Sequence, residues 1–270
     1  MSAPDKTEPA STERVAGQVE HHTQELDITT VRFAGDSGDG MQVLGTRFAN
    51  TSAIFGEDVM TLAEYPAEIR APAGTLHGVS GFQMSMGPQD VYTAGDQVDV
   101  LVAMNPAALK TNLPLVRPNG IIIVNVDSFT EKNLTKAGYT ESPIDNQSLA
   151  AFRVFPVSIT RLTNVALSPL GLPVVQIDRS KNFFALGLIC WLFNLPIENS
   201  LGWIEKKFKN DENVRKGNAE ALIAGNKYGE SAELFTTSFV IKKPDTPRKP
   251  GTYRYLSGNS ALAMGLISAA

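Results

Sequence analysis

The sequence predicts an α/β protein with a Rossmann-like layered fold, a mainly parallel sheet and a helical cap. Three observations favour this fold class. Short apolar or β-branched runs alternate with amphipathic segments between residue 28 and about residue 124, which is typical of βαβ units. The run Val98–Met104 is almost wholly apolar, as expected of a central parallel strand that is covered on both faces. A glycine-rich segment, residues 35–40, separates an expected strand from an expected helix.

The expected elements of the first half follow from these patterns in chain order. The helix Met41–Phe55 carries apolar residues at helical spacing. A second helix begins at Pro106 behind the N-cap residue Asn105 and ends near Pro114. The expected strands, which are β-branched, alternating or apolar, are Ile28–Ala34, Val59–Ala63, Val79–Met86, Val98–Met104 and Gly120–Val124.

The second half predicts one further strand and then a helical cap on the sheet. The strand lies near Phe152–Val157. The helices, each with apolar residues near helical spacing, are Ser180–Phe193, Ile197–Phe208 and Asp211–Glu230. Ser180 is the expected N-cap of the first of these helices.

Composition shifts predict four parts of the chain. Residues 1–25 are polar and are expected to be a disordered tail, and residues 26–235 form the main domain. Residues 236–252 include a charged, Pro-rich stretch and are expected to be a linker. Residues 253–270 start a second domain. Their apolar helix has no stop signal, which indicates that the natural protein continues past Ala270.

Charge and hydropathy exclude several classes of partner. The chain has 270 residues, a formal net charge of −4 and 43% hydrophobic residues. Because no Lys/Arg run is present, neither nucleic acid nor an anionic membrane is expected as a main partner. Apolar stretches fall short of the ~20 residues that span a bilayer, and the N-terminus does not resemble a secretory signal. We therefore expect a cytoplasmic protein.

A single cysteine, Cys190, limits the redox chemistry of the chain. One thiol excludes a disulfide framework, a Cys-rich zinc site and an iron–sulfur cluster held by this chain alone. Cys190 lies in the apolar run 186–193. We expect a buried core thiol rather than a nucleophile, because reactive cysteines need an electropositive, partly exposed setting.

The glycine loop, residues 35–40, is the main candidate ligand site. It consists of Gly35, Asp36, Ser37, Gly38, Asp39 and Gly40. Glycines let the backbone turn sharply and approach a ligand, and free N–H groups at a helix start favour an anion. A purely structural role in a tight turn is an equal alternative. The two aspartates oppose a phosphate unless a cation offsets them, and the candidate cation is Arg70.

The glycine loop departs from three known phosphate-binding motifs. A P-loop requires Lys and Ser or Thr where this chain has Met41 and Gln42, which argues against nucleotide hydrolysis. The dinucleotide fingerprint has another glycine spacing, although Glu64 stands about where a ribose-binding acid would lie. Residues 38–40 match the start of the thiamine diphosphate motif, but its Asn-rich end is missing from residues 63–69. No complete metal–diphosphate site is therefore expected.

Three separated motifs carry a resemblance to a known family. They are Phe33–Gln42, Glu68–Gln83 and Ala103–Lys110, and in this order they resemble the gamma domain of 2-oxoacid:ferredoxin oxidoreductases. The similarity spans about Thr29 to Ser231. Residues 258–265 resemble the first helix of the pyrimidine-binding domain that follows in fused alpha subunits. The 2-oxoglutarate type, in which the gamma domain comes first in the chain, is the most similar.

The resemblance implies a subunit of a larger enzyme. That enzyme decarboxylates a 2-oxoacid on thiamine diphosphate, passes electrons singly through 4Fe–4S clusters to ferredoxin, and transfers the acyl group to coenzyme A. The diphosphate, its Mg and the clusters would lie on a beta subunit, so we expect a hetero-oligomer and an inactive isolated chain. The gamma domain would help enclose coenzyme A. The segments facing that ligand would be the glycine loop and residues 70–75.

Within these motifs, several single residues have both a ligand role and a structural role open to them. Arg70 would pair either with a coenzyme phosphate or with a nearby glutamate, and Gly74 and Thr75 would face the ligand or form a turn. Asn105 ends a strand where open α/β sheets bind ligands, but it is favoured as an N-cap. His77 has no second histidine at metal-ligand spacing, so no metal site is expected.

No residue is assigned a catalytic role, and two other classes of function stay open. One is a nicotinamide- or flavin-binding Rossmann module with its own redox chemistry, and the other is a non-catalytic subunit scaffold.

The glycine loop also departs from the commoner gamma-domain pattern G-x-G-G-Q-G, because it carries the acid Asp39. This extra acid leaves direct contact with a phosphate open.

Overall fold

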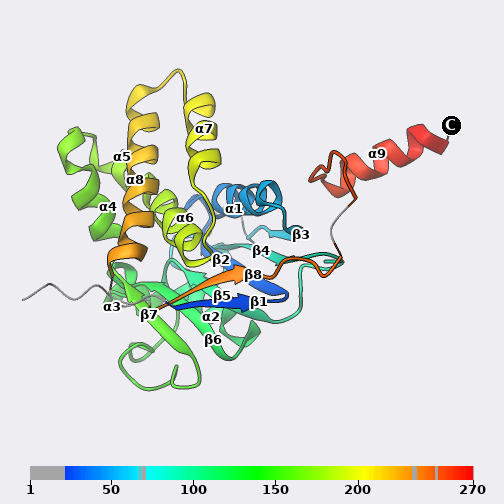
Figure 1. Ribbon diagram of the computed structural model, residues 1–270. Helices are drawn as coiled ribbons and strands as arrows, with labels where there is room; N and C mark the ends of the chain where they lie inside the picture. The colour runs from blue at the N-terminus through cyan, green and yellow to red at the C-terminus, as the bar shows by residue number, and fades with distance from the viewer. Residues whose placement is uncertain (1–21, 67, 69–70, 233–235, 247–248, 270) are drawn as a thin grey trace, which may run out of the picture.

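A six-stranded sheet forms the centre of the computed structural model, which describes residues 22–66, 68, 71–232, 236–246 and 249–269. The strand order is β3-β4-β2-β5-β6-β7 (Figure 1). These strands are β2 (Thr29–Asp36), β3 (Asp58–Glu64), β4 (Val79–Gly87), β5 (Val98–Ala103), β6 (Val116–Asn125) and β7 (Arg153–Val157). Strands β2, β5, β6 and β7 run parallel, whereas β4 pairs antiparallel with β2 and β3. The predicted mainly parallel sheet is confirmed.

Alternate side chains of the parallel strands enter two separate cores. Val100, Val102 and Ile123 belong to one hydrophobic cluster, whereas Leu101 and Ile122 belong to the other. Successive side chains of a strand point to opposite faces, so a strand covered on both faces is apolar at most of its positions. This explains why Val98–Met104 was readable as a central strand.

Helices cover both faces of the sheet. On one face lie α1 (Met41–Phe55), α6 (Lys181–Leu192) and α8 (Glu212–Ser231), joined by α4 (Ile159–Leu167), α5 (Val174–Arg179) and α7 (Glu198–Lys207). On the other face, α2 (Pro106–Asn112) packs against the second core, and α3 (Glu131–Lys136) contacts α2. The predicted helical cap is therefore confirmed, although the sequence did not predict α3, α4 or α5.

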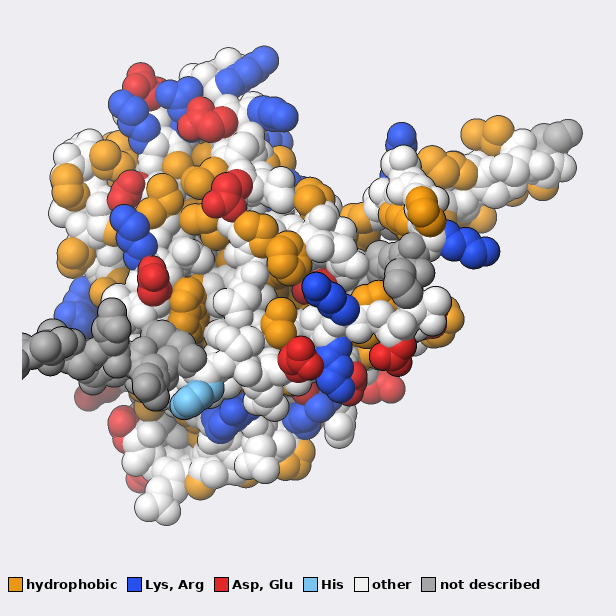
Figure 2. Space-filling view, in the orientation of Figure 1, with side chains coloured by type: hydrophobic (Ala, Val, Ile, Leu, Met, Phe, Trp, Pro, Cys, Tyr) orange, Lys and Arg blue, Asp and Glu red, His pale blue; other side chains and the backbone are white. Residues whose placement is uncertain are grey.

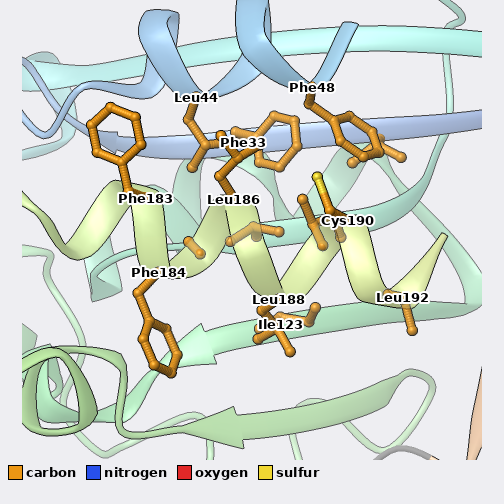
Figure 3. Packing of buried hydrophobic residues seen from close by; sticks show 14 of the residues in the cluster. Phe33, Leu44, Phe48, Ile123, Phe183, Phe184, Leu186, Leu188, Cys190 and Leu192 are labelled. Atoms are coloured by element: carbon orange, nitrogen blue, oxygen red, sulfur yellow. The ribbon is translucent and has the colours of Figure 1, made fainter. Parts of the chain in front are cut away.

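Helix α6 is the centre of the larger core. From Phe183 onward its side chains are apolar around the whole helix, as expected of a helix buried on every side. Phe183 and Cys190 point into the same core as Phe33 and Phe48 (Figure 3). Cys190 is fully buried, and burial raises the pKa of its thiol to about 12. The predicted core role of this cysteine is confirmed.

Helices α6 and α8 cross so closely that both need glycine at the crossing. A Cβ atom on Gly225 would lie 1.9 Å from the carbonyl oxygen of Phe184, and one on Gly187 would lie 2.0 Å from that of Leu222. Backbone atoms cannot move aside as a flexible side chain can. The two glycines therefore set the distance between these helices.

Two strands lie where the sequence predicted a tail and a linker. Strand β1 (His22–Leu26) pairs in parallel with β8 (Thr237–Ile241), and the hydroxyls of Thr23 and Ser238 are 3.3 Å apart. Residues 22–25 of the expected tail and residues 237–241 of the expected linker thus belong to the folded unit. Because four of the five β1 residues are polar and exposed, this strand gives no apolar signal.

The chain ends in the predicted helix, α9 (Gly258–Ala269), which projects from the body of the molecule. Before it, the hydroxyl of Tyr255 lies 2.7 Å from that of Thr61 on β3. Hydrophobic side chains line the exposed surface of α9 (Figure 2), and its Ile267 is 78% exposed. Its membership of a second domain stays a prediction. None of the helices in the described ranges is long and apolar enough to span a membrane.

Candidate functional site

The glycine loop links the end of β2 to the start of α1, as predicted. Gly38 and Gly40 have φ angles of 107° and 78°, a region that residues with a side chain rarely adopt. Gly40 is also the N-cap of α1, and a Cβ atom there would lie 2.2 Å from Nδ2 of Asn182. Both glycines are therefore required by the turn itself, whatever the loop binds.

The two aspartates of the loop are used in different ways. Oδ2 of Asp39 accepts a hydrogen bond from the backbone N–H of Asp36 at 3.0 Å, which closes the loop on itself. Oδ2 of Asp36 accepts one from the N–H of Gly74 at 2.9 Å, which joins two of the three sequence motifs. Its other oxygen, Oδ1, is buried and has no hydrogen-bond partner among the described residues. Asp36 is thus the link between the loop and the segment that contains Gly74.

The environment of Asp36 disfavours its charge. Burial is the main cause that raises the pKa of this carboxyl, and the neighbouring Asp39 raises it further. The N–H of Gly74, the Asn105 side chain and Lys181 act in the opposite direction without outweighing burial. A half-buried carboxyl with one solvent-shielded, unpartnered oxygen is unusual in a purely structural loop.

Lys181, the first residue of α6, supplies a cation that the sequence did not predict. Its ammonium nitrogen lies 3.2 Å from Oδ1 of Asp39 and 3.4 Å from Oδ1 of Asp178. Burial alone would lower the pKa of Lys181, but the two carboxylates outweigh it and the pKa is raised. Lys181 is therefore charged at neutral pH and offsets the acidity of the loop.

A small polar cavity of about 190 Å³ lies beside these groups. Its walls combine carboxylates, amides and ammonium groups, from Asp36, Asp39, Asn105, Asn133, Lys136 and Lys181. Lys136 donates a hydrogen bond to the carbonyl oxygen of Ala73 at 2.9 Å. Two lysines facing two carboxylates can hold a small group that carries both an acceptor and a donor. A second cavity, of about 230 Å³, lies along Ser37, Gly38 and Gly40 on the α1 side of the loop.

Other predicted site residues have structural roles in the same region. Oδ1 of Asn105 accepts a hydrogen bond from the N–H of Ala108 at 2.8 Å, so the favoured N-cap role is confirmed. The hydroxyl of Thr75 donates to the carbonyl of Pro72 at 2.7 Å, which is the turn role. Gly35 packs against Asp39 and Met104. Arg70 lies outside the described residues, so the structure does not place it.

The structure therefore gathers residues from three predicted motifs at one edge of the sheet. Asp36, Asp39, Gly74 and Asn105 line the 190 Å³ cavity together. Lys136 and Lys181 complete it and were missed. Lys181 begins α6, 142 positions after Asp39 in the chain, so only the packing of α6 against α1 brings it to the loop.

Comparison with known proteins gives one family and several relatives. The family model described as pyruvate ferredoxin/flavodoxin oxidoreductase matches residues 30–228. The chain is 48% identical over 246 residues to the 2-oxoglutarate oxidoreductase subunit KorA of Mycobacterium tuberculosis. That alignment covers 91% of this chain but 37% of the relative, so the chain spans little more than a third of the relative's length.

Two solved structures share the fold at lower identity. One is the 2-oxoglutarate:ferredoxin oxidoreductase from Magnetococcus marinus with 2-oxoglutarate, coenzyme A and succinyl-CoA bound. It is 23% identical with a TM-score of 0.62, over 82% of this chain and 34% of that chain. The other is the gamma subunit of a keto/oxoacid ferredoxin oxidoreductase from Geobacter sulfurreducens. It is 18% identical with a TM-score of 0.51, over 76% of this chain and 99% of that subunit.

Proposed function

Because the chain belongs to the pyruvate ferredoxin/flavodoxin oxidoreductase family, we propose that it is part of the alpha subunit of a 2-oxoacid:ferredoxin oxidoreductase. We further propose 2-oxoglutarate as the 2-oxoacid. The observation that carries this proposal is the 48% identity to the 2-oxoglutarate oxidoreductase subunit KorA over 91% of the chain.

The proposed reaction is an oxidative decarboxylation. The 2-oxoacid loses carbon dioxide, its electrons pass singly to ferredoxin, and its acyl group forms a thioester with coenzyme A as a proton is released. In this proposal the whole complex works in the cytoplasm, and a beta subunit holds thiamine diphosphate, Mg and the 4Fe–4S clusters. Cys190 supports that division of roles, because a fully buried thiol with a pKa of about 12 is a poor cluster ligand.

In this proposal the present chain helps enclose coenzyme A. The glycine loop and residues 70–75 face the coenzyme, and Lys181 and Lys136 provide positive charge beside them. The 190 Å³ cavity supports this assignment, because its ammonium groups offset Asp36 and Asp39. The acidic loop alone would repel a phosphate. The catalytic groups that act on the 2-oxoacid are not assigned to this chain.

The nicotinamide- or flavin-binding alternative is not favoured. Glu64, the acid that would meet a ribose, forms an ion pair with the buried Arg32. Arg32 also donates hydrogen bonds to Gln83 and Asn112. The Glu64 carboxylate is therefore engaged by Arg32 in a structural network and is not free to bind a ribose.

The test is an assay of the complete protein purified with its beta subunit. We expect ferredoxin reduction that requires both 2-oxoglutarate and coenzyme A, with succinyl-CoA as the product. Pyruvate in place of 2-oxoglutarate tests the choice of substrate. Activity with pyruvate alone would contradict the 2-oxoglutarate assignment, and reduction of NAD(P) by the chain without its partner would contradict the whole proposal.

A further inference from the structure

A third, larger cavity lies on the helical side of the glycine loop. It has a volume of about 610 Å³, within the ~300–1,000 Å³ that is typical of small-molecule sites. Side chains from α1, α5, α6 and α8, and from the turn before α8, line it. The apolar ones are Val43, Pro173, Val175, Phe183, Phe208 and Val214. Val43 and Val175 are 38% and 64% exposed, so the apolar wall is open to solvent.

Two amide groups in the lining of this cavity lack hydrogen-bond partners among the described residues. They are Nε2 of Gln176, which is a donor, and Oδ1 of Asn182, which is an acceptor. The Asn182 residue is only 6% exposed. A third amide of the lining, Asn218, is satisfied, because its Oδ1 lies 2.9 Å from the hydroxyl of Ser180. The fold thus provides a partner for Oδ1 of Asn218 but leaves one buried atom of Gln176 and one of Asn182 without a protein partner among the described residues.

A ligand that satisfies both groups must offer one acceptor and one donor on an apolar body. A secondary amide has this combination, and it tolerates either orientation of the two side-chain amides. Their terminal torsions have broad energy wells, so each amide can turn into the cavity at low cost. We infer that this cavity binds an aliphatic secondary amide, held by Gln176 and Asn182 between the valine and phenylalanine side chains.

The cavity adjoins the glycine loop at two residues. Val43 also lines the 230 Å³ cavity beside Gly38 and Gly40. Asn182 directly follows Lys181, and its amide abuts Gly40. A ligand held by the glycine loop can therefore extend into the larger cavity without leaving the surface of α1.

Two sources of such an amide are compatible with this geometry. One is the aliphatic arm of coenzyme A, which carries secondary amides; this source rests on the proposed function. The other is a separate small amide that binds the cavity alone. The probes below distinguish the two sources.

The experiment uses calorimetric titration of the complex formed by the complete protein and its beta subunit. The probes are coenzyme A, pantetheine, adenosine 3′,5′-bisphosphate and N-acetylleucine N-methylamide. The variants are Asn182→Leu and Gln176→Met, which keep approximate shape but remove the hydrogen-bonding groups. Asn199→Leu, on the exposed side of α7 and outside the cavity, is the matched control.

We expect each cavity variant to weaken pantetheine and coenzyme A by about tenfold or more, as the loss of a hydrogen bond at a buried group predicts. Adenosine 3′,5′-bisphosphate, which lacks the amide arm, should bind all variants equally. Asn199→Leu should match the wild type with every probe. Melting temperatures of the cavity variants should not fall, because each removes an unpartnered buried polar group.

Three results would be decisive. If coenzyme A, pantetheine and N-acetylleucine N-methylamide all bind the cavity variants as tightly as the wild type, the inference is overturned while the proposed function stands. If coenzyme A does not bind but N-acetylleucine N-methylamide binds in an Asn182-dependent way, the amide site is supported and the proposed function fails. If no amide probe binds, water alone satisfies the two side chains and the inference is wrong.

Discussion

The ammonium nitrogen of Lys181 lies 3.2 Å from Oδ1 of Asp39, so the first residue of α6 is tied to the loop that starts α1. Both side chains are largely buried, with 15% and 17% of their surface exposed. The pair therefore differs from a surface ion pair, whose contribution is usually small. It couples the core helix α6 to the candidate ligand site.

Replacing Lys181 by Met should weaken coenzyme A binding in the assembled enzyme by roughly 10- to 100-fold, because the acidic loop loses its cation. The same change should lower the free energy of unfolding by about 1 to 3 kcal/mol, since Asp39 is left without its partner. The measurements are the Michaelis constant for coenzyme A and a denaturant titration. Lys206→Met, an exposed change on α7, is the control.

The double variant Lys181→Met/Asp39→Asn separates the two effects. It should recover most of the lost stability, because no unpaired carboxylate remains, without recovering coenzyme A affinity. Recovery of both would show that Lys181 acts only by neutralising Asp39.

Glu57 should make the stability of the protein fall with rising pH. Burial raises the pKa of its carboxyl from 4.5 to about 7, against a smaller opposite effect of Ser52. The folded state therefore keeps a proton that the unfolded state has released, and stability drops between pH 4.5 and 7. Above that range, Glu57→Gln should be more stable than the wild type by roughly 2 to 3 kcal/mol. Parallel denaturant titrations at pH 4 and pH 8 test this, and equal differences at both pH values would contradict it.

The crossing of α6 and α8 should not tolerate a single methyl group. Gly225→Ala places a Cβ atom against the carbonyl of Phe184, and we expect a loss of at least about 1 to 3 kcal/mol of stability. Gly202→Ala in α7 is the matched control, because nothing lies within 4 Å of its Cβ position. That control should stabilise the protein by about 0.5 to 1 kcal/mol. Thermal melting of the two variants checks the difference, and a similar effect in both would refute the close crossing.

Cys190 should be inert in the folded protein. With a pKa of about 12 and full burial, its thiolate is scarce and inaccessible at pH 8. Ellman's reagent should therefore react only after unfolding in guanidinium chloride, where the same thiol serves as the positive control. Stoichiometric labelling of the native chain within minutes would contradict the buried position.

The sequence predicted the helices and strands that show a clear local pattern, such as regular apolar spacing, an apolar run or a glycine at a helix end. Helix α1 was expected at Met41–Phe55 and has those bounds, because a glycine precedes it, Gly56 ends it and its apolar spacing is regular. The central strand at residues 98–104 was expected for its continuous apolar run. Strand β1 and helix α5 were missed, because exposed polar or short segments acquire their structure from partners elsewhere in the chain.

The candidate site was predictable only in part, for the same reason. The glycine loop, Gly74 and Asn105 lie in contiguous motifs with turn or cap chemistry that a sequence displays. The bond between Asp36 and Gly74, and the approach of Lys181 and Lys136, depend on the sheet order and on the packing of α6. The unpartnered amides of Gln176 and Asn182 likewise become visible only when the surrounding helices are in place.

The parallel pairing of β1 with β8 bears on how this protein forms during synthesis. Thr23 and Ser238 are 215 positions apart, so a ribosome must make almost the entire unit before the first strand finds its neighbour. Until then β1 has no strand to pair with. The sheet from β2 to β7 can assemble earlier, because its paired strands are separated by fewer residues than β1 and β8 are. Among the described strands, the first to be synthesised therefore pairs only with the last, so this two-stranded sheet cannot form until β8 has been made.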